Sequence, residues 1–282
     1  MSDARPPVDW QKGFSNGNAG LLVSRDLINA STIEVRARLA DGDLLGAVQL
    51  SLDVATFELD LLQSPILIDQ MVACALLTIS VGETWRDEDL SRLDKPALEL
   101  LAEGLEQIDA RCPRVFDWRG EALLLANTLK QLGEEGELFA DSPVSLRTFD
   151  YGWSERWAAA DAVLQKVEMW EELKTNGASS WNVRRQELCD VLESVEVQGN
   201  PVLRVSFSNF VGAERSLRSS LASVRLLRLA VACRLGGELP ELLDPLGAGS
   251  FEVSPLGDGA VVFRSGVDGD AASGIKRTVT FR

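Results

Sequence analysis

Apolar residues recur at helical spacing along most of the chain up to Leu235. One such stretch runs from Leu21 to about Ala40, and another follows Asp41-Gly42-Asp43. The second stretch carries an apolar stripe formed by Leu44, Val48, Leu52, Ala55, Leu59 and Leu62. Intervals of three and four residues are typical of an amphipathic α-helix. Because Gly42 can adopt a left-handed conformation and Asp43 can cap the amides that follow, we predict a tight helix hairpin at this point.

Similar helical patterns recur further along the chain. Their approximate limits are Ser64 to Val81, Asp94 to Ile108, Val115 to Leu132, Ser154 to Leu173, Trp181 to Val197 and Leu217 to Leu235. Ser64 and Asp94 are of the residue types that cap helix N-termini, and a proline at the first helical position supports the helix after Ser64. The sequence therefore predicts a mainly α-helical protein built as an array of antiparallel helix pairs.

The pattern changes after Gly236-Gly237. Three short β-prone pieces, 251–253, 260–263 and 278–281, are separated by turns rich in glycine and aspartate, which is typical of a small antiparallel sheet. Because a few short strands are not stable alone, we expect this β element to pack on the helix before it. Leu239, Leu242, Val262 and Phe263 are the predicted apolar contacts.

These boundaries divide the chain into five regions. They are an irregular lead (1–20), an N-terminal helical layer (21–133), an acidic loop (134–153), a C-terminal helical layer (154–235) and a small β tail packed on the last helix (236–282).

Composition excludes several classes of function. The chain has 28 Lys and Arg against 43 Asp and Glu, a formal net charge of −15, which makes nucleic acid and anionic membrane surfaces poor partners. It contains no histidine, so triads and zinc sites that need an imidazole are excluded. We identify no catalytic motif, metal site or cofactor site. The four cysteines lie far apart, and we predict buried structural thiols, Cys74 and Cys233 among them.

No apolar run is long enough to span a bilayer. We therefore expect no membrane insertion by this chain and, as the sequence stands, a cytoplasmic location. A cell-envelope location would follow if an upstream anchor had been removed.

Several side-chain groups have both a functional and a structural interpretation. Trp153, Trp157, Trp170 and Trp181 could form an aromatic binding surface, although core packing is the favoured interpretation. The carboxylates of Glu134, Glu135, Glu137 and Asp141 could form an acid/base pair or a calcium cluster, but a solvated loop explains them. Arg119 and Glu121 could form a polar site, and a structural ion pair is favoured.

Two resemblances add expectations. The string Leu39-Ala40-Asp41-Gly42-Asp43-Leu44-Leu45-Gly46-Ala47 resembles the helix-turn-helix joint of tetratricopeptide-like arrays. Continued through Ser64-Pro65-Ile66-Leu67-Ile68-Asp69-Gln70-Met71-Val72 and Trp118-Arg119-Gly120-Glu121-Ala122, it resembles a family of uncharacterised bacterial helical proteins of planctomycete type. In that family a membrane anchor often precedes the helical region, and no activity is known.

The tail is similar to the C-terminal part of type II secretion pseudopilins. The similarity covers the helix Arg225 to Leu235, Gly237-x-x-Pro240-x-x-Leu243, and a hairpin that ends at 263–270. The resemblance implies a calcium site at Asp268 and Asp270. We expect no calcium binding, because two carboxylates supply too few of the roughly six to eight oxygen ligands that the ion takes. The pilin-type N-terminal helix is missing, and Ser254-Pro255-Leu256-Gly257 replaces the usual segment before the hairpin, so a pilus function is not implied.

Two functions remain open. The first is a noncatalytic helical scaffold or interaction module that binds a protein or peptide, because helix arrays leave a groove suited to such partners. The alternative is a hydrolase-type enzyme that uses a carboxylate pair in a groove. Two close carboxylates in a pocket, with raised pKa values, would favour the enzyme, and an open apolar groove would favour binding.

Overall fold

The computed structural model describes residues 19–64, 66–116, 119–120, 123, 126–127, 158, 160–165, 180–194, 210–256, 260–265 and 275–280. The described residues are mainly helical and end in a three-stranded antiparallel sheet, as predicted. Helix α1 (Ala19–Asp41) and helix α2 (Leu44–Leu62) form the predicted hairpin. Gly42 has a φ of 83°, and the Asp43 carboxylate accepts a hydrogen bond from the Gly46 amide.

Three helical segments follow α2 and precede a long helix. They are α3 (Leu67–Leu77), the π-helix η2 (Thr78–Glu83) and the short α4 (Asp87–Leu90). Helix α5 (Lys95–Arg111) begins as predicted, with the Asp94 side chain accepting a hydrogen bond from the Ala97 amide. The predicted cap at Ser64 is displaced, since α3 begins after Ile66. The Ser64 hydroxyl instead accepts from the Ile66 amide and donates to Asp69.

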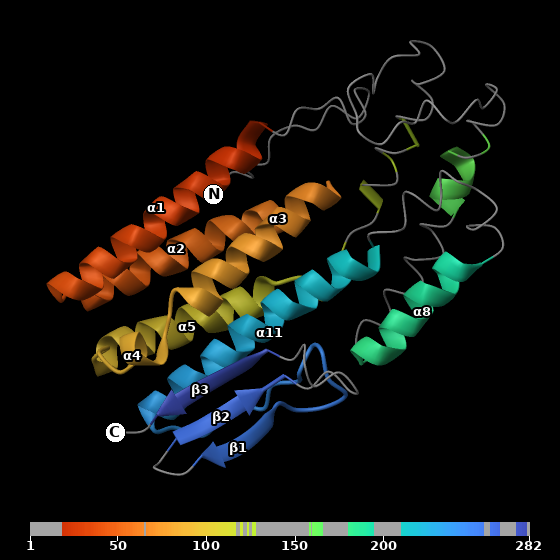
Figure 1. Cartoon of the computed structure of the whole chain (residues 1–282). Helices are drawn as coiled ribbons and strands as arrows, with labels where there is room; N and C mark the ends of the chain where they lie inside the picture. The colour runs from red at the N-terminus through yellow and green to blue at the C-terminus, as the bar shows by residue number, and fades with distance from the viewer. Residues whose placement is uncertain are drawn as a thin grey trace.

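The later part of the chain supplies two helices and the sheet. Helix α8 (Trp181–Glu193) and helix α11 (Phe210–Leu235) are followed by β1 (Glu252–Leu256), β2 (Ala260–Arg264) and β3 (Lys276–Thr280). The strand order is β1-β2-β3, with both pairings antiparallel. In Figure 1, α11 lies between the sheet on one side and helices α3 and α5 on the other.

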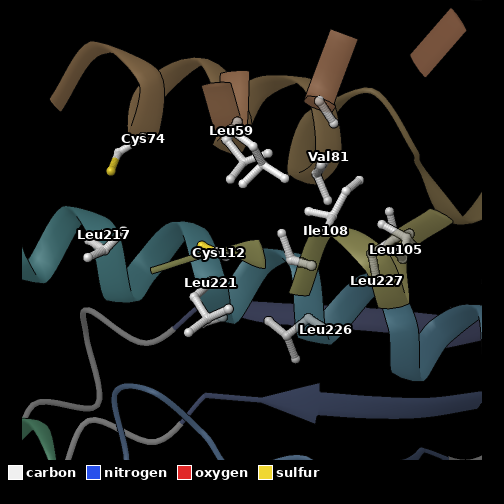
Figure 2. Close-up of a cluster of buried hydrophobic side chains, with 14 of the residues drawn as sticks. Leu59, Cys74, Val81, Leu105, Ile108, Cys112, Leu217, Leu221, Leu226 and Leu227 are labelled. Carbon is white, nitrogen blue, oxygen red and sulfur yellow. The ribbon is translucent and has the colours of Figure 1, made fainter. Parts of the chain in front are cut away.

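One hydrophobic core unites helices from both ends of the chain. Figure 2 shows leucines of α11 alongside apolar side chains of α2, η2 and α5, and all of them belong to the same buried cluster. Leu217, Leu221, Val224 and Leu227 of α11 are all buried, at intervals that place them on one face of the helix. The described parts of the two predicted helical layers therefore share a single core. Whether the helix pairs are true repeats stays a prediction.

The sheet packs on α11, as predicted, because three short strands are not stable alone. Phe263 and Val262 of β2 are buried, and β3 contacts α11. Arg277 of β3 donates a hydrogen bond to the backbone carbonyl of Trp85, just before α4. Burial lowers the pKa of Arg277 to about 10, and the nearby carboxylate of Asp87 acts in the opposite direction. A cationic side chain therefore anchors the sheet to the α3–α4 region.

Two side chains that the sequence predicted to be buried, one an apolar contact of the tail and one a thiol, differ from the structure. Leu239 is exposed, because residues 237–242 contain no helix or strand that would place this side chain against the core. Cys233 is only partly buried, because it lies near the end of α11, where helix cover is incomplete. Leu242 packs against the core and Cys74 is buried, both as predicted.

Substitution of Gly42 by valine should lower the free energy of unfolding by about 1 kcal/mol or more, because a β-branched residue is strained at positive φ. No atom lies within 4 Å of the position of the added Cβ, so the loss would report backbone strain alone. Urea unfolding measures it. Gly249→Val is the matched control, since Gly249 is equally uncrowded and lacks a positive φ. Equal losses of unfolding free energy in Gly42→Val and Gly249→Val would contradict backbone strain at positive φ as the cause.

Candidate functional site

A groove of about 310 Å³ lies between α2 and α5. Its α2 wall is formed by Gln49, Leu52, Asp53 and Thr56, and its α5 wall by Leu100, Glu103, Gly104, Gln107, Ile108 and Arg111. On each helix the successive positions follow the pattern i, i+3, i+4, i+7, so they share one face. We define these ten residues as the α2–α5 groove.

The floor of the α2–α5 groove depends on a glycine. A Cβ added at Gly104 would lie 2.4 Å from the methyl carbons of Leu52, so the two helices are in close contact there. The Leu52 and Ile108 side chains are buried beneath the groove. Absence of a side chain at position 104 therefore lets Leu52 pack directly against the α5 backbone, which brings the two walls of the groove together over an apolar base.

The rim of the α2–α5 groove is polar and rich in hydrogen-bond acceptors. Gln49 Nε2 donates to Asp53 Oδ1 at 2.9 Å, and Gln107 Nε2 donates to Glu103 Oε1 at 3.4 Å. Both carboxylates and both amides are exposed. Among the groove residues the one cation is Arg111, whose guanidinium is 2.8 Å from Asp60 Oδ1. The rim thus presents carboxylates from both walls, and its cation is already paired.

A second polar feature is buried beside the π-helix and lies apart from the groove. Glu58 is completely buried, and its Oε2 accepts a hydrogen bond of 2.5 Å from Ser80 of η2. Its Oε1 has no hydrogen-bond partner among the described residues. Burial raises the pKa of Glu58 to about 8, against the opposing effect of the Ser80 hydrogen bond. Glu58 is therefore mostly protonated at neutral pH, but it does not line the α2–α5 groove, where the carboxylates of Asp53 and Glu103 lie.

A third feature is a carboxylate surrounded by arginines. Asp109 of α5 is buried and accepts hydrogen bonds from Arg114 Nη1 at 3.0 Å, Arg225 Nε at 3.0 Å, and Arg228 Nη1. Burial acts to raise the pKa of Asp109, but the guanidinium groups of Arg225 and Arg114 outweigh it and lower the pKa. This cluster joins the end of α5 to α11. Arg225 also donates to the Leu243 carbonyl, so the cluster ties in the segment before β1.

A fourth feature joins α8 to α11. Arg184 donates to both oxygens of Glu214, at 2.8 and 3.2 Å, and both side chains are completely buried. Arg218 lies 3.5 Å from the same carboxylate and 5.6 Å from the ring centre of Trp181. Trp181 is buried, which agrees with core packing for this member of the predicted tryptophan group. Trp153, Trp157 and Trp170 lie outside the described residues.

The other predicted site residues are mostly outside the described part of the chain. Glu121, Glu134, Glu135, Glu137, Asp141, Asp268 and Asp270 are in this group. Arg119 is described and exposed. The four thiols are free, and burial raises the pKa of Cys112 to about 12, so this thiol is not poised as a nucleophile.

Sequence reasoning missed the groove and the buried charges, although part of the signal is present. Glu58 falls between Ala55 and Leu62 on the core stripe of α2, and Glu214 precedes Leu217 on the core face of α11. A charged residue in phase with an apolar stripe indicates a buried charge. The groove has no comparable signal, because Gly104 faces Leu52 only after two helices have packed.

Among the described residues, no group of three Cys, Asp or Glu side chains is placed to hold a metal ion. No described helix is long and apolar enough to cross a bilayer. A scan against protein-family models, a search of curated proteins and a search of solved structures each find no match to this chain.

Proposed function

We propose that the protein is a noncatalytic helical interaction module that binds a segment of another protein in the α2–α5 groove. The observation that carries this proposal is the form of the groove. An apolar base, where Leu52 packs against Gly104, lies under a rim of exposed side chains. A cleft of about 310 Å³ is at the lower end of the size range of ligand sites, so it suits one or two side chains of a partner.

The geometry favours binding over catalysis. A general acid must hold its proton near neutral pH, which in proteins usually requires burial of the carboxyl group. Asp53 and Glu103 of the groove are both exposed and each accepts a hydrogen bond from its own helix. Glu58 and Asp69 are the described carboxyl groups whose pKa is raised, and neither lines the groove.

The alternative remains a hydrolase-type enzyme, and one observation favours it. Asp53 and Glu103 extend into the same groove from opposite walls, which is the arrangement that a pair of catalytic carboxylates needs. If this alternative were correct, replacement of either carboxylate by its amide would abolish hydrolysis of a substrate without weakening its binding.

Photo-crosslinking in the cells that make the protein tests the proposed function. A photoreactive phenylalanine derivative at Gln49, on the groove rim, should give a covalent adduct with another protein. The same residue at Ile33 of α1, which is 70% exposed, is the control and should give none. Thr56→Phe, which places a ring inside the groove, should remove the adduct formed at position 49.

Circular dichroism would verify that these variants stay folded. Adducts of equal yield from positions 49 and 33 would contradict the proposal, as would an adduct that persists in Thr56→Phe. An adduct between two copies of this chain would show that the groove binds a second copy of the protein, and it would overturn the proposal of a different protein as partner.

A further inference from the structure

The α2–α5 groove has a chemical preference that goes beyond binding in general. We infer that it takes a basic segment of the partner, with one arginine or lysine side chain lying along the Leu52–Ile108 floor and its charged end between the carboxylates of Asp53 and Glu103. This inference rests on the proposed function and names the chemistry of the partner.

The hydrogen bonds at the rim carry the first step. Each glutamine amide donates to the carboxylate one turn away on its own helix, so that donor is occupied. The rim then offers a ligand mostly acceptors, namely the remaining lone pairs of Asp53 and Glu103 and the amide oxygens, because each glutamine amide has only one further N–H group. A carboxylate that has accepted one hydrogen bond still has room for further donors. The ligand should therefore bring N–H groups.

The charge at the rim carries the second step. Asp53 and Glu103 contribute two negative charges, and the positive charge of Arg111 is offset by Asp60 at 2.8 Å. The formal net charge of −15 adds a long-range attraction for cations and repels acidic segments. Both the local charge at the rim and the net charge of the chain therefore favour a cationic ligand. Charge complementarity of this kind also determines which partner binds and how it is aligned in the groove.

Third, the floor of the groove determines the shape of cation that fits. Leu52 and Ile108 line the base of the groove beneath two carboxylates, and they are only 8% and 2% exposed, so the apolar area that they offer is narrow. Lysine and arginine side chains combine an apolar stem with a charged end, as the groove combines an apolar floor with a charged rim. Their methylene stems bury against apolar surface while the charged end stays at a polar rim.

Fluorescence anisotropy with the full chain tests the inference. The probe is a short fluorescein-labelled peptide in which arginine alternates with alanine. In low-salt buffer, Asp53→Asn and Glu103→Gln should each raise its Kd about threefold to tenfold, and the double variant should raise it further. A peptide with citrulline in place of arginine has the same shape without the charge, and should not bind.

Glu99→Gln is the matched control. It removes one negative charge from the same helix, from an exposed glutamate that pairs with Lys95 and does not line the groove. Its Kd should stay within about twofold of that of the unmodified protein. An equal effect of Glu99→Gln, equal binding of the citrulline peptide, or an unchanged Kd in the double variant would each overturn the inference.

The two proposals can fail separately. If the cross-link from position 49 is found and the arginine peptide does not bind in the groove, the interaction module stands and its cationic preference falls. If neither is observed, both proposals fall.

Discussion

Replacement of Glu214 by leucine should cost about 3–5 kcal/mol of the free energy of unfolding, because it leaves two arginines buried without their carboxylate. Arg184 and Glu214 are both 0% exposed, and Arg184 donates two hydrogen bonds to this one side chain. The remaining acidic neighbour, Glu187, is 3.4 Å from Arg184 and partly exposed, so it compensates poorly. Urea unfolding at neutral pH measures the loss.

A double variant separates the charge effect from lost packing. Arg184→Met combined with Glu214→Leu removes both charges of the Arg184–Glu214 pair and leaves Arg218 as the one buried arginine of this cluster, and apolar replacement of a buried ion pair is often tolerated. We therefore expect the double variant to be more stable than Glu214→Leu alone by about 2 kcal/mol. Arg218 keeps its contacts with the Pro245 carbonyl and the Trp181 ring.

The exposed pair Lys95–Glu99 provides the comparison for this prediction. Its side chains are 78% and 57% exposed, so Glu99→Ala should change the stability by less than about 0.5 kcal/mol. A loss in Glu214→Leu as small as that in Glu99→Ala would show that the α8–α11 ion pair does not contribute to the stability of the fold.

Replacement of Glu58 by glutamine should change how stability depends on pH. In the folded protein the pKa of Glu58 is raised from 4.5 to about 8. Below pH 4.5 the carboxyl group is protonated in both states and costs nothing. Between about pH 4.5 and 8 the unfolded chain releases a proton that the folded chain retains, so the unmodified protein loses stability as pH rises. Glutamine cannot ionise and abolishes this loss.

The expected change in stability is large because the pKa of Glu58 differs greatly between the folded and the unfolded protein. The stability difference between Glu58→Gln and the unmodified protein should grow by about 3–4 kcal/mol in favour of the variant from pH 5 to pH 8. Differences between the two curves cancel the contributions of other groups, including Asp109, whose lowered pKa makes its stabilisation fall away only as the solution becomes acidic.

Urea unfolding at a series of pH values measures both curves. Glu238→Gln is the control, since Glu238 is an exposed glutamate in the segment after α11, and its curve should run parallel to that of the unmodified protein. Parallel curves for Glu58→Gln as well would show that Glu58 ionises as readily in the folded protein as in the unfolded chain.

Local features of this fold follow from the sequence because they depend on neighbouring residues. The hairpin at Gly42 was predicted from one glycine and one capping aspartate, and the start of α5 from Asp94. The positions of the three strands were predicted from short β-prone pieces between turns. The displaced start of α3 fits the same principle, since the Ser64 hydroxyl has two possible local partners and the sequence does not choose between them.

The groove and the buried charges were decided by the tertiary structure. Gly104 meets Leu52, Asp109 meets Arg225, and Arg184 meets Glu214 across helices that are distant in the sequence. Periodicity determines which face of a helix is buried, but it does not determine which helix covers that face. The sequence by itself therefore determined the main helices, the caps at Asp43 and Asp94, and the positions of the three strands. Helix packing alone decided which polar side chains meet inside the core and which remain exposed at the groove rim, because these meetings depend on contacts between distant elements.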